Sequence, residues 1–340
     1  MIEHQITLTT RDGQEVKFSN MAGTDIITAG EKAGIILPAL CRNGGCGACV
    51  GRCQDGAYTM DCSPSVLSAE AAAEGEVLLC RTYPQNDLHI SAPYDFTLIR
   101  FGKQDGRQAV ITNLVQIAER TLQLNLQWLA LDAGQAVEFE PGQCMELEIP
   151  DSGIRRAYTL ANTGNWRGEM EFLIRLQPDG RFSGYLRELA TIGQILNVYG
   201  PGGAFAMQTA SFNPAIFIAG GTGLAPFLSI LRRLADWGED RTIHLLFGIN
   251  QESELFYLDE LQRLQLLLPG FSMTVCVWSP LPGWCGFSGT PVDALQQYLQ
   301  NNPADYDIYL CGPPSLVTAA TQLAIAEGVA EQQIYSEKFV

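Results

Sequence analysis

Cysteines near the start of the chain have a spacing that suits iron–sulfur chemistry. Cys41, Cys46 and Cys49 lie in a Cys-x4-Cys-x2-Cys stretch, and Cys80 follows after thirty intervening residues. This is the plant-type ligand pattern of a [2Fe–2S] cluster, in which four thiolates hold two irons. Such a cluster carries one electron at a time, so the pattern predicts an electron-transfer protein.

The glycines of this stretch fit the same chemistry. Gly44, Gly45 and Gly47 would let the backbone wrap tightly and turn its amides toward inorganic sulfide. Zinc is the alternative metal, but zinc sites usually pair two short Cys-x2-Cys clips, whereas Cys80 is single and distant. A nicotinamide delivers two electrons as hydride, so it can reduce a one-electron cluster only through a mediator.

The middle of the chain carries a motif suited to a flavin mediator. Arg156, Tyr158 and Thr159 form an Arg-x-Tyr-Thr sequence. A guanidinium suits phosphate, and a phenol offers a flat surface with a polar edge. The motif resembles that of the ferredoxin–NADP reductase superfamily. This resemblance implies that Arg156 binds the FAD pyrophosphate, Tyr158 packs on the flavin ring and Thr159 hydrogen-bonds near flavin N5.

Two further motifs follow in the order seen in that superfamily. Gly180 and Ser183 belong to a Gly-x-x-Ser-x-x-Leu sequence, which resembles the phosphate loop of the family. Ser183 would lie near the start of a helix, where free amides favour an anion. Gly200 and Gly203 belong to a Gly-Pro-x-Gly-x-Phe sequence, which resembles the turn that ends the flavin domain. Together the three motifs imply an FAD cofactor.

A glycine turn in the last third of the chain predicts a dinucleotide site. Gly220, Gly221, Thr222 and Gly223 lie between an apolar strand and a helix start. Glycines let a pyrophosphate approach the backbone, and the helix N-terminus supplies amides. The turn is not the G-x-G-x-x-G fingerprint of dehydrogenases. It matches the Gly-Gly-Thr-Gly turn of the reductase superfamily, which implies that a nicotinamide dinucleotide binds here.

Residues near the C-terminus extend this resemblance. Cys311, Gly312 and Pro313 belong to a Cys-Gly-Pro-Pro sequence that resembles the segment beside the nicotinamide, with a buried structural cysteine as the alternative for Cys311. Phe339 is the candidate for the aromatic that covers the flavin in the superfamily; a terminal aromatic packed on the sheet is the alternative.

The cofactor preference is predicted from the segment after the strand that ends near residue 248. An NADP site would need Arg or Lys there for the 2′-phosphate. The chain has Glu252 and Glu254 instead, which would repel that phosphate. The sequence therefore predicts NADH as the electron donor.

The elements that position these residues fall into three segments, predicted at 1–98, 99–208 and 209–340. The first segment is predicted to be a compact α+β domain, with strands at 5–9, 15–18 and 87–91 and a helix at 25–33. The resemblance implies that it is a β-grasp [2Fe–2S] ferredoxin domain. The second reads as an antiparallel β-barrel for FAD, with one helix at 184–189 and strands at 110–117, 121–128, 144–149, 170–176 and 195–199.

The third segment alternates strands with helices, which predicts an α/β domain with a parallel sheet for NAD. Strands are expected at 215–219, 242–247, 272–277 and 308–310. Helices are expected at 225–237, 255–266, 292–300 and 315–327.

Composition and charge limit the function classes. The net charge is −16, with −6 in residues 1–98, so nucleic acid is an unfavourable partner and a basic protein patch is a favourable one. Acidity that only aids solubility is the alternative. No apolar run approaches the roughly 20 residues of a membrane span, and no signal peptide is visible at the N-terminus. These features predict a cytoplasmic protein without a membrane partner.

The resemblance covers the whole chain in the order ferredoxin, flavin, nicotinamide. It is similar to the single-chain reductases of bacterial multicomponent oxygenases, which feed either Rieske ring-hydroxylating dioxygenases or soluble di-iron monooxygenases of the methane and butane type. Several stretches look closest to the methane monooxygenase reductase, namely residues 78–84, 87–88, 93–94, 171–176, 178–183, 254–261 and 307–314.

The resemblance thus implies NADH-dependent electron transfer through FAD and the cluster to a hydroxylase component, with no general acid–base residue required. A redox sensor or binding module that uses the cluster without turnover is the alternative from another class.

Overall fold

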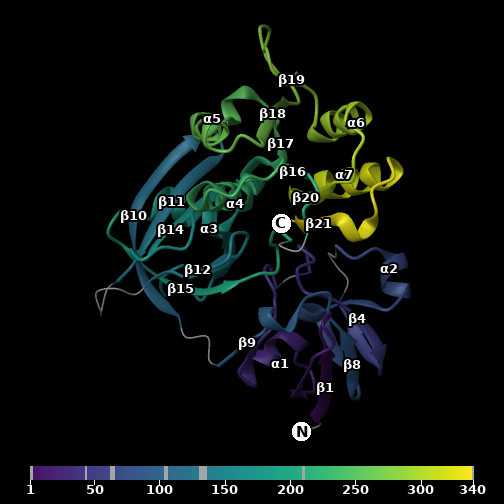
Figure 1. Ribbon diagram of the computed structural model, residues 1–340. Helices are drawn as coiled ribbons and strands as arrows, with labels where there is room; N and C mark the ends of the chain where they lie inside the picture. Colours follow the sequence, from purple (N-terminus) through teal and green to yellow (C-terminus); the bar gives the residue numbers. More distant parts are fainter. Residues whose placement is uncertain are drawn as a thin grey trace. The chain divides into compact units, whose positions relative to one another are not determined.

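The structure is a computed structural model that describes residues 3–42, 44–61, 66–102, 106–129, 136–208 and 211–338. The chain divides into two compact units, one formed mainly by residues 1–106 and the other by residues 107–201 and 205–339 (Figure 1). The second unit therefore contains most of both the flavin and the nicotinamide segments. The segment boundaries near 99 and 209 stay a prediction.

The first unit is built on a mixed five-stranded sheet of order β2-β1-β8-β4-β6. β1 pairs antiparallel with β2 and parallel with β8. Ile6 and Leu8 alternate with less buried positions on β1 and form part of the core together with the helix α1. The side chain of Asp25 caps that helix by accepting from the Thr28 amide at 3.0 Å. The bounds are β1 Glu3–Thr9, β2 Glu15–Met21, α1 Ile26–Lys32, β4 Val50–Asp55, β6 Glu76–Leu78 and β8 Leu88–Ser91.

The predicted elements of this unit are confirmed, but several short ones were not predicted. They include β4 and β6, and also β3 Ile35–Ile36, β5 Tyr58–Met60, α2 Ala69–Ala73, β7 Thr82–Pro84 and β9 Arg100–Phe101. These segments are too short, or too mixed in polarity, to show a clear period.

The flavin half of the second unit is a six-stranded sheet of order β13-β12-β15-β10-β11-β14. An antiparallel bridge between Leu160 and Phe172 joins its two ends, which closes the predicted barrel. The helix α3 begins at Arg181, so the predicted start at residue 184 was three residues late. The bounds are β10 Arg107–Ala118, β11 Thr121–Trp128, β12 Cys144–Glu148, β13 Arg155–Thr159, β14 Glu169–Arg175, α3 Arg181–Glu188 and β15 Ile195–Gly202.

The nicotinamide half has a parallel sheet of order β19-β18-β17-β16-β20-β21, as the strand–helix alternation predicts. Its strands are β16 Ala215–Gly220, β17 Ile243–Ile249, β18 Phe271–Val277, β19 Phe287–Ser288, β20 Asp307–Gly312 and β21 Ile334–Lys338. Its helices are α4 Leu224–Trp237, α5 Leu258–Leu267, α6 Pro291–Asn301 and α7 Pro314–Ala326. The helix predicted from residue 255 begins at Leu258, and β21 was not predicted.

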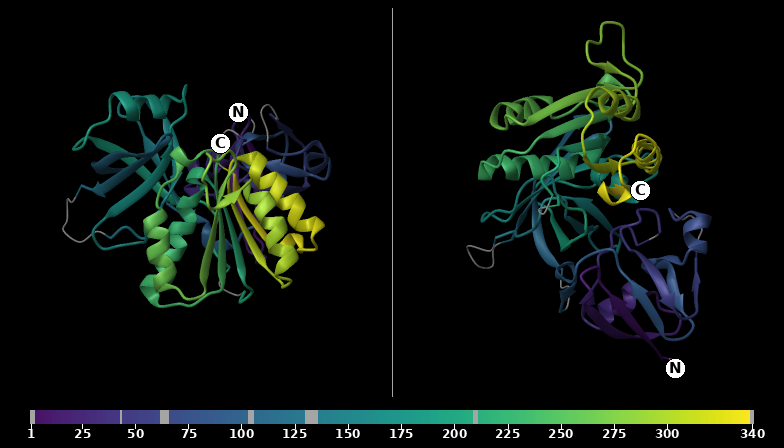
Figure 2. Two further views of the ribbon diagram at one scale, coloured as in Figure 1. Left: turned by 90° about the horizontal axis from the view of Figure 1, so that it is seen from above. Right: turned by 45° about the vertical axis from the view of Figure 1, so that its right-hand side comes forward.

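Helices cover both faces of this sheet (Figure 2). Phe217 and Phe247 pack toward α4 and α5, whereas the neighbouring Ile218 and Leu246 pack toward α6 and α7. The strand order reverses between β16 and β20, and ligands of open α/β sheets bind outside the carboxyl ends of the strands at such a point. None of the described helices is long and apolar enough to cross a membrane.

Candidate functional site

The four predicted cluster ligands come together in the first unit as two pairs. The Cys49 and Cys80 sulfur atoms are 3.2 Å apart and buried. The Cys46 amide donates to the Cys41 sulfur at 3.3 Å, and the Cys41 amide donates to the Cys46 sulfur at 3.5 Å. Cys80 lies on a short 3-10 helix, Leu79–Arg81, inside the core of the unit.

This pairing fits two irons, because a [2Fe–2S] cluster shares four thiolates between two irons. The hydrogen bond to the Cys80 thiol, together with burial, raises the pKa of Cys49 well above its usual range. Metal binding must therefore displace thiol protons.

The backbone around the ligands has the predicted tight turns. Gly44 and Gly47 have φ values of +83° and +81°, which favour glycine. Arg42, directly after a ligand, also has a positive φ, of +53°. Two hydrogen bonds, at 2.8 and 2.5 Å, hold its guanidinium on Glu31 of α1. The helix thus fixes the start of the cysteine loop.

The predicted flavin motifs lie next to one another in the second unit. Tyr158 on β13 packs against Phe182, with ring centroids 5.2 Å apart, and Phe182 is the neighbour of Ser183. Met145 is the strand partner of Tyr158. A side chain at Gly200 would meet the Met145 sulfur at 2.8 Å. β13, the start of α3 and the end of β15 therefore converge.

The polar groups of these motifs are placed for an anion. The Arg156 residue is exposed, and its guanidinium donates only to the Arg155 carbonyl, at 2.8 Å, among the described residues. Ser183 lies in the first turn of α3, where its hydroxyl accepts from the Gln177 amide at 2.9 Å. Gly180 immediately precedes that helix, and Gly203 has a φ of +93°. A guanidinium and free helix amides suit the FAD phosphates.

The nicotinamide motifs meet at the reversal point of the parallel sheet. Gly221–Gly223, which includes Thr222, forms a 3-10 turn between β16 and α4. A side chain at Gly223 would come 2.1 Å from the Cys311 carbonyl, and one at Gly220 would meet Pro313 at 2.8 Å. Gly312 has a φ of +154°. These close approaches leave no room for a side chain at Gly220 or Gly223. A turn without side chains lets a pyrophosphate approach the backbone, so the residues fit a dinucleotide.

A buried carboxyl that the sequence reasoning missed links the flavin and nicotinamide motifs. Thr159 donates to Glu337 of β21 at 3.2 Å, and the Cys311 thiol lies 4.0 Å from the same Glu337 oxygen (Oε2). Burial raises the pKa of Glu337 to about 8, against the smaller lowering effect of the Thr159 hydrogen bond. Glu337 is therefore mainly protonated at neutral pH. The sequence alone does not indicate that Glu337 is buried; its burial follows from the pairing of β21 with β20.

Arg175 is a second residue that the sequence reasoning missed. It ends β14, and its guanidinium lies 3.6 Å from where a Gly221 side chain would begin. It forms no hydrogen bond or ion pair with any described residue. A half-buried cation from the flavin half thus faces the nucleotide turn of the nicotinamide half.

The acidic residues after β17 are fixed by backbone bonds. Glu252 accepts from the Leu281 amide at 2.9 Å, and Glu254 accepts from the Asn250 amide at 3.2 Å. One of the predicted positions, Phe339, lies outside the described residues.

Comparisons with known proteins agree with the three-part architecture. Residues 9–85 match the 2Fe-2S iron-sulfur cluster binding domain, residues 109–207 the oxidoreductase FAD-binding domain, and residues 217–322 the oxidoreductase NAD-binding domain. The cofactors predicted from the sequence, a [2Fe–2S] cluster, FAD and NAD, are thereby confirmed.

Whole-length relatives include components of two kinds of oxygenase. The toluate 1,2-dioxygenase electron transfer component of Pseudomonas putida is 34% identical over 99% of this chain and 98% of its own length. Methane monooxygenase component C of Methylosinus trichosporium is 34% identical over 87% of each chain. Among solved structures, a cytochrome P450 reductase from Amycolatopsis is 26% identical, covers 98% of both chains and has a TM-score of 0.76.

A ferredoxin reductase of carbazole 1,9a-dioxygenase shares the fold over the full length of both chains, with a TM-score of 0.71 at 23% identity. Relatives that are more than 30% identical cover nearly the whole chain, and this shows the family to which the chain belongs. The chain belongs to the single-chain electron-transfer reductases of multicomponent oxygenases, which combine [2Fe–2S], FAD and NAD domains.

Proposed function

We propose that this chain passes electrons from NADH, through FAD and the [2Fe–2S] cluster, to the hydroxylase of a soluble di-iron monooxygenase. One observation carries the proposal. Thr159 of the flavin motif and Cys311 of the nicotinamide motif both lie against Glu337. When bound, FAD supplies the conversion between two-electron nicotinamide chemistry and one-electron cluster chemistry.

The residues of the chain have positioning roles in this scheme. Arg156 and the start of α3 bind the FAD phosphates, and Tyr158 supports the flavin ring. The turn Gly221–Gly223 and the guanidinium of Arg175 bind the dinucleotide pyrophosphate. Glu337 holds a proton at its carboxyl beside Thr159. The arrangement excludes water from the contact between the two motifs, because Thr159, Cys311 and Glu337 are all buried.

NADH is the proposed donor because the segments that follow β17 and β18 lack a cation that could bind a 2′-phosphate. Residues 250–262 and 278–290 contain no Lys or Arg, whereas Glu252 and Glu254 are held in place by backbone bonds. We expect kcat/KM for NADH to exceed that for NADPH by at least about tenfold, since like charges repel by several kcal/mol. A preference for NADPH in steady-state assays would contradict this.

The partner is proposed from the sequence stretches that resemble the methane monooxygenase reductase, including residues 254–261 and 307–314. A Rieske dioxygenase is the second candidate, because the toluate dioxygenase component matches 99% of the chain and the methane component 87%. Either partner would receive single electrons from the cluster.

Two experiments test the proposal. Anaerobic addition of NADH should bleach both flavin and cluster absorbance; flavin that NADH cannot reduce would rule the reductase out. Purified hydroxylases of both classes are then compared as acceptors. Faster NADH-dependent turnover with the di-iron hydroxylase supports the first candidate, and faster turnover with the Rieske oxygenase supports the second.

A further inference from the structure

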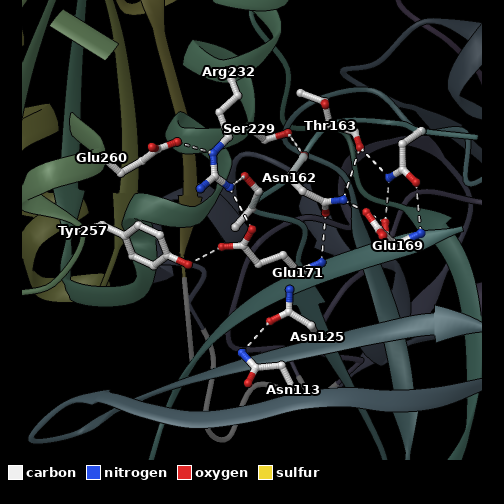
Figure 3. A network of polar contacts seen from close by, with 12 residues as sticks. Asn113, Asn125, Asn162, Thr163, Glu169, Glu171, Ser229, Arg232, Tyr257 and Glu260 are labelled. Carbon is white, nitrogen blue, oxygen red and sulfur yellow. Dashed lines mark hydrogen bonds and ion pairs between the residues drawn. The ribbon is translucent and has the colours of Figure 1, made fainter. Parts of the chain in front are cut away.

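A cluster of charged and polar side chains joins the flavin half to the nicotinamide half (Figure 3). Arg232 of α4 donates to the Ala161 carbonyl at 3.0 Å and to Glu171 at 2.9 Å. Its Nε donates to Glu260 at 2.9 Å. Ala161 and Glu171 belong to the flavin half, and Glu260 belongs to the nicotinamide half. The guanidinium of Arg232 therefore binds residues of both halves. Arg232, Glu171, Glu260 and Tyr257 are called the Arg232 cluster below.

The cluster is largely withdrawn from water. The side chains of Arg232 and Glu171 are 17% and 11% exposed. Burial acts to lower the pKa of Arg232, but Glu171 and Glu260 raise it overall, so the charge is retained. Removal of one partner from such a pair leaves an uncompensated buried charge and is strongly destabilising. The cluster is therefore more than a surface contact.

Further bonds hold the same helix and strand together. The Tyr257 hydroxyl donates to Glu171. The backbone of Tyr257 has a φ of +59°, which is unusual for a non-glycine residue. On α4, the buried Ser229 donates to the Asn162 carbonyl at 2.6 Å. The Asn162 side chain in turn bonds the Glu169 carbonyl and the Glu171 amide, at 2.8 and 2.9 Å. α4 is thus fixed to the flavin half at neighbouring turns.

These contacts lie on the elements that carry both cofactor motifs. Residues 161 and 162 follow β13, which holds Tyr158 and Thr159, by two and three positions. α4 begins directly after the nucleotide turn Gly221–Gly223. β14 contacts α4 through Glu171 and faces the turn itself through Arg175. A shift of α4 relative to β13 would consequently move the nicotinamide relative to the flavin.

We propose that Arg232 is a positioning residue, which sets the distance and orientation of the nicotinamide on the flavin by locking α4 to β13 and β14. This rests on the proposed NADH-to-FAD reaction. Misplacement of reacting groups by about 1 Å can cost about a hundredfold in rate. Among the described residues no hydrogen bond joins the cluster to a cofactor motif, so its effect is on geometry.

The test compares variants of the FAD- and cluster-loaded protein by stopped flow at saturating NADH. Arg232→Met should slow flavin reduction at least about tenfold and change the isotope effect with deuterated NADH, while FAD content and cluster absorbance stay normal. Arg232→Lys, which keeps the charge and one donor, should recover part of the rate. The matched control is Arg263→Gln, because Arg263 binds Glu260 but is 55% exposed and has no hydrogen bond or ion pair with the described residues of the flavin half; it should change the rate less than twofold.

Unfolding in denaturant gives a readout apart from activity. In a double-mutant cycle of Arg232→Met and Glu171→Gln, coupled residues give non-additive effects, whereas independent ones add. If Arg232→Met fails to fold, Tyr257→Phe removes one hydroxyl at nearly constant volume and should slow flavin reduction by a smaller factor. The positioning role would be overturned if these variants reduced the flavin at the wild-type rate. It would also be overturned if the changes in the free energy of unfolding were additive in the double mutant. A wild-type protein that NADH cannot reduce would instead refute the proposed function.

Discussion

Glu337 is a carboxyl whose surroundings change its protonation at neutral pH. It is fully buried between Thr159 and Cys311, and burial raises its pKa from 4.5 to about 8. In the unfolded chain the carboxyl loses its proton near pH 4.5, but in the folded protein it keeps the proton to about pH 8. The folded state therefore binds one more proton in this window, and its stability falls as the pH rises.

Glu337→Gln should remove this pH dependence, because the amide cannot ionise. Between about pH 5 and 8, the free energy of unfolding of the wild type should decrease by about 1.4 kcal/mol per pH unit more steeply than that of the variant. Urea unfolding of the FAD-loaded protein at three pH values measures the slopes. Glu331→Gln, which changes an exposed carboxyl in the same region, is the control and should keep the wild-type slope. Equal slopes for wild type and Glu337→Gln would contradict the assignment.

At the scale of elements, the close approach of β16, β20 and α4 shapes the nucleotide turn. Gly223 has an ordinary φ of −59°, so glycine is needed there for space and not for conformation. An alanine would place its side chain 2.1 Å from the Cys311 carbonyl, which belongs to the backbone of β20 and cannot rotate away.

Gly223→Ala should therefore force α4 and β20 apart, at a cost of about 1–3 kcal/mol in stability, and weaken NADH binding at least tenfold. Thermal unfolding and the KM for NADH measure the two effects. Gly184→Ala is the control, because nothing lies within 4 Å of the added carbon inside α3; it should keep or slightly raise the stability. Wild-type binding in Gly223→Ala would show that the turn tolerates the shift.

The elements also show what sequence patterns can predict here. β16 is a continuous apolar run, and β17 and β20 are apolar except for His244 and Asp307; this pattern is typical of buried parallel strands. The motif glycines were found because close backbone approach requires that residue type. Glu337 and Arg232 were missed because an acid near a chain end and a base on an amphipathic helix usually face solvent. Only the packing of β21 on β20, and of α4 on β14, buries them.

At the scale of the whole molecule, the charge distribution bears on how the partner is met. The net charge is −16, and residues 1–98, which hold the predicted cluster ligands, contribute −6. In the proposed function electrons leave from the cluster, so a hydroxylase would have to approach this segment. An acidic surface attracts a basic patch over roughly a Debye length, about 10 Å at 0.1 M salt. We propose that the acidic surface of residues 1–98 steers the hydroxylase toward the cluster.

Salt should accordingly slow electron transfer to the hydroxylase. Between about 0.05 and 0.5 M NaCl the second-order rate constant should fall several-fold or more, because steering weakens as charges are screened. Reduction of the bound flavin at saturating NADH is the internal control, since this step occurs within one chain and should change much less. Charge-reversal of Asp55, an exposed acid of the first unit that forms no ion pair with any described residue, should reduce both the rate at low salt and its salt dependence. A rate constant independent of salt would mean that the acidity of this segment serves solubility and not docking.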